Sequence, residues 1–173
     1  RRLLDFFWLP AERTSFEDAH LNNANRAALL FFAAHLPVFG AIGYFNGTGL
    51  LMGLGLTAFF LLGPLVAHVT QDNPRVVSVV HGATAMCMGG VLVHLGQGPV
   101  QIEMHFYFFS ILAILAGFGN PLVIWTAALT VTLHHLVLWW FLPSSVFNYD
   151  ASFWVVGVHA LFVVVESVVA AYI

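Results

Sequence analysis

The sequence is poor in charge and contains no lysine at all. Only 8% of its 173 residues are Asp, Glu, Lys or Arg, whereas soluble domains average about 25%. Five arginines against eight acidic residues give a formal net charge of −3, so the chain lacks the basic surface of a nucleic-acid-binding protein. This composition excludes an ordinary cytosolic domain, a disordered chain and a nucleic-acid partner.

Cysteine is nearly absent as well. Cys87 is the only one, which excludes a disulfide framework and a four-cysteine zinc site. Apolar residues are abundant instead, since 60% of the chain is hydrophobic and the mean hydropathy is +0.90. The sequence therefore predicts an integral membrane protein whose main partner is the lipid bilayer.

Six apolar stretches are each about as long as a transmembrane helix, which needs about 20 residues. We expect them at residues 26–45, 50–70, 75–95, 102–118, 121–142 and 151–173. The breaks between them are rich in Gly, Asn, Pro and Ser, as turns are. No stretch alternates with a period of two, which argues against a β-barrel. We predict an all-α membrane protein in which residues 25–173 form a six-helix transmembrane bundle.

Residues 1–24 hold most of the charge and are predicted to form a separate, cytoplasmic or interfacial segment. Residues 1–8 combine two arginines with leucine, phenylalanine and tryptophan, which is typical of a short amphipathic helix in the membrane interface. An interhelical linker or a frayed terminus is the alternative. Residues 14–17 have capping-box spacing and could begin a helix that runs into the first span.

The arginines indicate the orientation of the bundle. All five precede the first span or lie between the second and the third: Arg1, Arg2, Arg13, Arg26 and Arg75. The positive-inside rule therefore predicts a bacterial inner-membrane protein with both termini in the cytoplasm. Aromatic residues near the opposite interface would form an outer belt: Trp139, Trp140, Phe147, Tyr149 and Trp154. The chain lacks an initial Met and stops inside an apolar run, so we expect it to be part of a longer protein.

Histidine is the chemically informative residue, with nine in the chain and eight in or beside the spans. Ionisable groups in a bilayer are costly and usually mark function. Five histidines share the outer half of the bundle within roughly 10 Å of depth, at 1.5 Å per residue: His94, His105, His134, His135 and His159. Glu103 lies at the same level. Because imidazole and carboxylate suit late transition metals, we predict a Cu, Zn or Fe ion held by these residues.

Three further features are less distinctive. Glu166 lies seven residues after His159 on nearly the same helix face, so it is expected to have a supporting or proton-linked role; a protonated, hydrogen-bonded core carboxyl is the alternative. His68 and His81 flank the loop between the second and third spans and form a possible inner site, unless they are ordinary interfacial histidines. The thiol of Cys87 is more typical of packing than of copper binding.

Haem b is the alternative cofactor. His81 and His94 are thirteen residues apart on one helix, close to the spacing that places two haems in opposite leaflets, and axial ligation needs only two histidines. However, the outer half has no Arg or Lys for the propionates. A carboxylate among imidazoles also favours a bare cation.

An ordered set of motifs over residues 75–173 carries a family resemblance. The motifs are Val93-His94-Leu95, Ile102-Glu103-Met104-His105-Phe106-Tyr107-Phe108, His134-His135-Leu136, Val158-His159-Ala160 and Val165-Glu166. In this order they resemble the six-helix N-terminal membrane sensor region of bacterial chemoreceptors, diguanylate cyclases and hybrid histidine kinases. The resemblance implies an input domain whose last helix continues into a cytoplasmic effector. Tyr107 stands where the group commonly has a second histidine, and a supporting or proton-linked role is expected for it.

The sequence thus predicts a metal-dependent sensor domain that signals through its last helix. Pairing into a homodimer is expected by analogy with other signalling membrane regions, and binding rather than catalysis is expected of this segment. Three other functions remain open: a b-type cytochrome, a membrane metalloenzyme acting on a lipid or quinone, and a metal or proton transporter.

Overall fold

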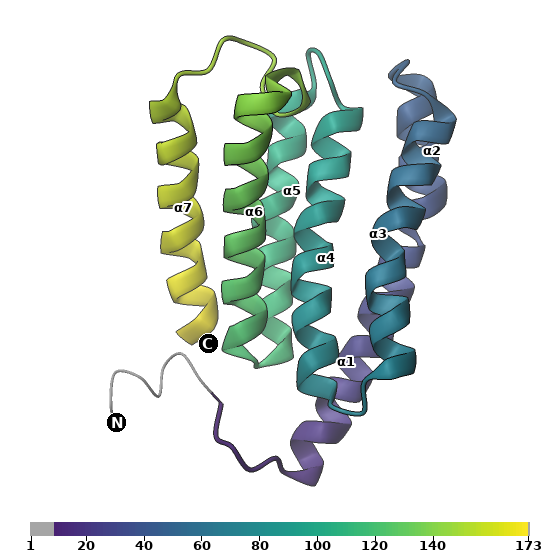
Figure 1. Cartoon of the computed structure of the whole chain (residues 1–173), viewed down its shortest axis with the longest axis vertical. Helices are drawn as coiled ribbons and strands as arrows, with labels where there is room; N and C mark the ends of the chain where they lie inside the picture. The colour runs from purple at the N-terminus through teal and green to yellow at the C-terminus, as the bar shows by residue number, and fades with distance from the viewer. Residues whose placement is uncertain (1–8, 173) are drawn as a thin grey trace.

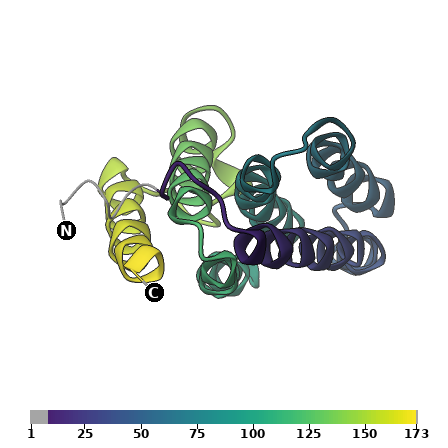
Figure 2. The same cartoon turned by 90° about the horizontal axis from the view of Figure 1, so that it is seen from below.

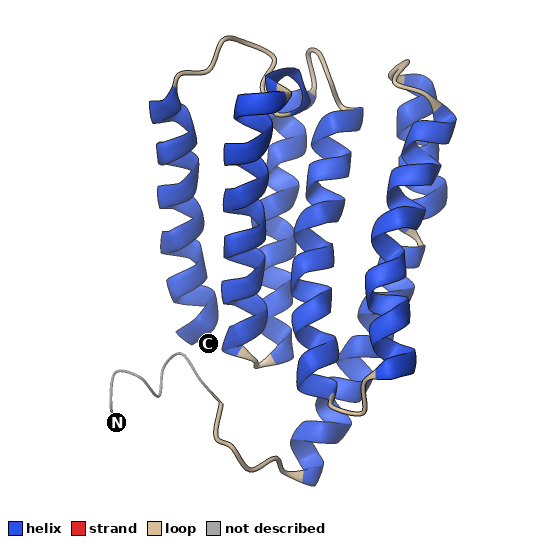
Figure 3. Ribbon diagram, in the orientation of Figure 1, coloured by secondary structure: helices blue, strands red, loops and turns tan. Residues whose placement is uncertain are grey.

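The computed structural model describes residues 9–172, and their regular structure is entirely helical (Figure 3). The elements are α1 (Ser15–Ala33), α2 (His35–Phe45), α3 (Leu50–Thr70), α4 (Pro74–Leu95), α5 (Gln101–Leu115), η2 (Ala116–Phe118), α6 (Pro121–Phe141), η3 (Pro143–Ser145) and α7 (Phe153–Tyr172). The all-α prediction is therefore confirmed for the described part. The expected interfacial helix of residues 1–8 lies outside it.

Six helices are long and apolar enough to cross a membrane, with lengths of 18 to 31 residues and mean hydropathies of 1.4 to 2.1. Four of them are single α-helices, whereas α1 continues into α2 and α5 continues into η2. They run alternately up and down, so that α1 begins and α7 ends at one end of the bundle (Figure 1). We call this the lower end and the opposite one the upper end.

The first helix begins earlier than expected. It was predicted from residue 26, but α1 starts at Ser15, because the hydroxyl of Thr14 caps it by accepting a 3.1 Å hydrogen bond from the backbone N–H of Glu17. The capping-box spacing at residues 14–17 therefore does mark a helix start. Residues 15–24, assigned from sequence to a separate segment, continue directly into the first apolar helix.

Arg75 ties the start of α1 to the start of α4. Its guanidinium donates to both carboxylate oxygens of Glu17, at 2.5 and 2.8 Å, and to the backbone carbonyl of Pro10 at 2.7 Å. A forked donor matches a carboxylate in this bidentate manner. The arginine predicted to mark the cytoplasmic side thus also fixes where the chain enters the bundle.

The break between α1 and α2 lies at Ala34 and has a local cause. Pro37 lacks a backbone N–H, so it cannot donate to the carbonyl four residues before it and the helix is interrupted there. The ring of His35 stabilises the break, since its Nδ1 donates to the carbonyl of Phe31 at 2.8 Å. The side chain of His35 therefore supplies a donor to a backbone carbonyl beside the break.

Asn-Pro pairs begin two other helices. Asn73 caps α4 by accepting from the backbone N–H of Arg75 at 3.1 Å, and Asn120 caps α6 by accepting from that of Leu122, also at 3.1 Å. The following prolines occupy the first helical turn, where a missing N–H costs nothing. These turns hold the lower ends of α4 and α6 in place.

Helix α4 is the centre of the bundle and α7 lies at its edge. In α4, 72% of the most apolar segment is buried, against 22–39% in the other five spans. Helices α1, α3, α5 and α6 pack around α4, whereas α7 packs mainly against α6 and α5 (Figure 2). The last helix is therefore the one whose position depends on the fewest neighbours.

Glycine permits close contacts between the central helix and its neighbours. A methyl group on Gly82 of α4 would lie 2.6 Å from the carbonyl oxygen of Val123 on α6, and one on Gly89 would lie 2.5 Å from the ring of Phe108 on α5. No side chain fits in either position without moving a neighbour. The central helix can therefore approach α5 and α6 only because these residues have no side chain.

We expect Gly82→Ala to lower the free energy of unfolding by about 1–3 kcal/mol, because the added methyl group collides with the backbone of α6. Gly55→Ala is the matched control, since no heavy atom lies within 4 Å of a methyl group there. Thermal unfolding in detergent, followed by circular dichroism, measures both. Equal unfolding temperatures for the two variants would contradict the close contact.

Candidate metal centre

Three of the histidines singled out from the sequence converge near the upper end. His105 on α5, His135 on α6 and His159 on α7 each offer a ring nitrogen, and these nitrogens lie within 4.8 Å of one another. The ring centroids are 5.5 Å apart for His105–His135, 5.4 Å for His135–His159 and 5.8 Å for His105–His159. We call this group the histidine triad.

The same local hydrogen bond orients all three rings. In each, Nδ1 pairs with the backbone carbonyl one helical turn earlier: Gln101 for His105 at 2.9 Å, Val131 for His135 at 2.9 Å and Val155 for His159 at 2.8 Å. A carbonyl oxygen can only accept, so Nδ1 must carry the proton. The proton-free nitrogen of each neutral ring is then Nε2.

The Nε2 atoms are left for a ligand. Those of His105 and His135 are buried and have no hydrogen-bond partner among the described residues. A buried polar atom without a hydrogen-bond partner costs free energy comparable to a lost hydrogen bond. Two such nitrogen atoms beside a third imidazole would therefore be stabilised by a bound ligand. Metal-bound histidines typically donate their second ring nitrogen to a carbonyl or carboxylate in this way. The donor set therefore fits a metal ion.

Phe147 closes the triad from the loop between α6 and α7. Its ring is 5% exposed and lies 6.2 Å from His105, 6.3 Å from His135 and 5.7 Å from His159, centroid to centroid. The sequence placed Phe147 in an outer aromatic belt, and this was wrong. In this loop Phe147 packs in a small apolar cluster with Val146 and Val156, and the indole N–H of Trp139 donates to the carbonyl of Ala151 at 2.7 Å beside it.

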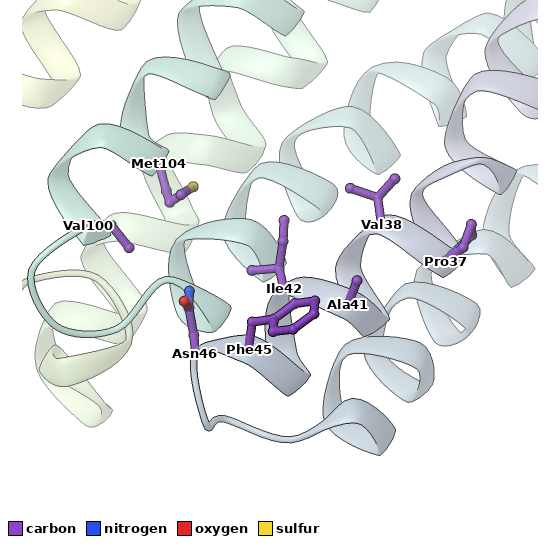
Figure 4. A pocket seen from close by; sticks show the side chains of 8 residues that line it. All are labelled: Pro37, Val38, Ala41, Ile42, Phe45, Asn46, Val100 and Met104. Atoms are coloured by element: carbon purple, nitrogen blue, oxygen red, sulfur yellow. The ribbon is translucent and has the colours of Figure 1, made fainter.

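Little empty space surrounds the triad. The crevice beside His135 and His159, between α6 and α7, has a volume of about 10 Å³. A groove of about 580 Å³ lies elsewhere, between α2 and the start of α5, and apolar side chains such as Ile42 and Met104 line it (Figure 4). That groove contains no histidine, cysteine or carboxylate, so it does not extend the metal centre.

His134 and His94, both predicted as ligands, lie outside the triad. His134 points toward α4, where a methyl group on Gly90 would lie 2.6 Å from its Nε2. Adjacent helical residues point about 100° apart, so His134 and His135 cannot both face α7. His94 pairs through Nδ1 with the hydroxyl of Ser145 at 2.5 Å, and the Nε2 amide of Gln97 lies 3.2 Å from the same atom.

Glu103 is not in the triad either. It is exposed in the first turn of α5, and two residues along a helix place it on nearly the opposite face from His105. Of the predicted set of five histidines and a carboxylate, the structure therefore brings three histidines together in the triad.

Tyr107 and Glu166 take positions away from the triad nitrogens. The hydroxyl of Tyr107 donates to Nε2 of His35 at 2.6 Å, so it supports the break between α1 and α2 rather than the triad. Glu166 is half-buried on α7, and its Oε2 atom is buried without a hydrogen-bond partner in the described structure; its predicted proton-linked role remains a prediction.

Comparison with known protein families, with curated proteins and with solved structures finds no match to this chain.

We expect His135→Ala and His159→Ala each to weaken binding of a divalent transition metal by at least about tenfold, since each removes one nitrogen ligand. His94→Ala is the control, because this ring is bound to Ser145 at the same end of the bundle. Metal content by inductively coupled plasma mass spectrometry, with a competitive chelator titration, measures the change. Equal losses in all three variants would show that the triad is not the binding site.

Phe147→Ala should make release of the ion to a chelator several-fold faster while leaving the number of bound ions unchanged, because it opens the triad to water without removing a ligand. Phe141→Ala, on a 78% exposed ring at the same end, serves as control. Stopped-flow chelation gives the rates. An unchanged release rate in Phe147→Ala would mean that the ring does not cover the site.

Proposed function

We propose that this chain is the membrane-embedded sensor domain of a bacterial signalling protein, and that a transition-metal ion bound by the histidine triad controls the position of its last helix. The observation that carries the proposal is the origin of the three ligands. Two belong to α5 and α6, and the third, His159, belongs to α7, the helix least enclosed by the rest of the bundle.

The proposed placement has α1 and the other long helices in the bacterial inner membrane with both termini in the cytoplasm. Arg13 and Arg75 lie at the lower end, around the starts of α1 and α4, which supports a cytoplasmic lower end by the positive-inside rule. Large apolar side chains such as Phe59, Trp154 and Leu161 are exposed on the bundle surface, as lipid-facing residues are. The triad then lies in the outer half of the membrane.

The donor set supports Cu, Zn or Fe as the ion. Three neutral imidazoles suit these metals, and a three-histidine set leaves a coordination position free for a water molecule or an external ligand. Haem is less well supported, because the volume beside the triad is about 10 Å³ and Phe147 packs against all three rings. A flat macrocycle would have to displace that ring.

The proposed switch follows from the ligand geometry. An ion held by all three rings would tie the upper half of α7 to α5 and α6, and loss of the ion would remove this link. A ligand shifts a two-state equilibrium only by its difference in affinity for the two states, and here the difference is the nitrogen of His159. We propose that α7 passes this change to a cytoplasmic effector, within a homodimer.

We expect metal to narrow and shift the distance distribution between the lower parts of α7 and α5. Spin labels at Val169→Cys and Ile114→Cys, in a Cys87→Ser background, report this distance by pulsed electron paramagnetic resonance with diamagnetic Zn²⁺. Both label positions are more than half exposed.

The control for this experiment is the same labelled chain with His159→Ala, which keeps the triad ligands on α5 and α6 but removes the one on α7. Its distance distribution should not respond to the ion. A response to Zn²⁺ that is the same with and without His159, or no response in either protein, would overturn the proposed coupling.

A further inference from the structure

A second pair of histidines meets in the lower half of the bundle. His68, near the end of α3, and His81, in the second turn of α4, approach with their Nε2 atoms 3.2 Å apart. Their ring planes are inclined by 71°. We call these two residues the lower histidine pair; neither belongs to the triad or contacts it through the hydrogen bonds described above.

The surroundings of His81 fix its orientation. Its side chain is 0% exposed, and its ring lies between Phe32 of α1, at a centroid distance of 5.8 Å and an inclination of 26°, and Phe118 of η2, at 6.2 Å and 31°. Two aromatic rings therefore hold the imidazole so that its Nε2 edge faces α3. His68 is only half-buried, so the space between the two nitrogens can be reached from its side.

A hydrogen bond between the two imidazoles is a poor explanation for this close contact. One Nε2 would have to donate and the other accept, at the long end of the range for such bonds. A single long hydrogen bond is therefore a weak explanation for the close contact between the buried ring of His81 and the half-buried ring of His68.

A shared metal ion explains the same geometry. Nitrogen ligands lie 2.0–2.1 Å from zinc, and two such ligands at a tetrahedral angle are about 3.3–3.4 Å apart. The observed separation of 3.2 Å is close to this value. Both Nε2 lone pairs would then point at one ion, and water entering beside His68 would complete the coordination.

We propose that His68 and His81 form a second binding site for an imidazole-preferring ion of the Cu²⁺ or Zn²⁺ class. The site is separate from the triad. His81 lies 14 residues before the end of α4 and His135 six residues before the end of α6, which places the two sites about 12 Å apart in depth. Because the lower pair supplies two protein ligands and the triad three, the lower site binds its ion more weakly.

The test uses the full chain with the triad disabled by His135→Ala and His159→Ala, titrated with Cu²⁺ alone and followed by electron paramagnetic resonance. The expected result is one equivalent of bound Cu²⁺ with the hyperfine pattern of two equivalent nitrogens. Adding His68→Ala, on the half-buried member of the pair, should abolish that signal. Adding His20→Ala instead, on an exposed histidine at the same end, should leave it unchanged.

His68→Asn provides a second variant that retains a polar side chain, and thermal unfolding confirms that each variant is folded. Absence of bound Cu²⁺ in the folded triad-disabled chain, or binding that survives both His68→Ala and His68→Asn, would overturn the proposal. These outcomes test the lower histidine pair alone, because the triad is already disabled in every variant. The triad is tested separately, by whether the unaltered chain binds more metal than the triad-disabled chain.

Discussion

An imidazole buried between apolar helices has two nitrogen atoms to satisfy, and the helix backbone can supply a partner for only one of them. In this bundle His35, His105, His135 and His159 all donate Nδ1–H to the carbonyl one turn earlier. That local bond leaves Nε2 as an acceptor directed away from its own helix. Each such ring then needs a donor or a cation from elsewhere, and the neighbouring helices decide which it receives.

The two solutions in this structure differ in chemistry. Nε2 of His35 accepts a hydrogen bond from the hydroxyl of Tyr107. Both ring nitrogens of His35 then have partners, and the ring stabilises the break between α1 and α2. In the triad, Nε2 of His105 and of His135 has no hydrogen-bond partner among the described residues, and the ring that covers the triad, Phe147, offers no donor. The same backbone motif therefore produces a structural contact in one place and a candidate metal centre in another.

Glycines on α4 help to position two of the helices that carry the triad. Gly82 allows the lower end of α6 to approach α4 closely, and Gly89 does the same for α5. Helices α5 and α6 therefore lie beside the same central helix, and His105 and His135 meet at its side. Helix α7 completes the triad from the edge of the bundle. A binding site that joins a well-packed region to a loosely packed helix is well suited to convert occupancy into movement.

Much of the fold follows from the sequence alone. The bounds of α3 and α6, the turns built on Asn-Pro pairs and the cap at Thr14 are local features, set by hydropathy, backbone geometry and side-chain hydrogen bonds within a few residues. The depth of each histidine is equally local, since a helix advances a constant distance per residue. Composition and spacing were therefore sufficient to predict six apolar helices with several imidazoles at one level.

Which of those imidazoles meet was decided only by the tertiary structure. His134 and His135 are neighbours in sequence and equal in depth, but rotation about the helix axis turns one toward Gly90 and the other toward α7. Glu103 is turned away from His105 for the same reason, and Phe147 reaches the triad from the loop between α6 and α7. Helix rotation and loop path depend on contacts between segments that are distant in the sequence. The periodicity of a single segment gives no information on those contacts.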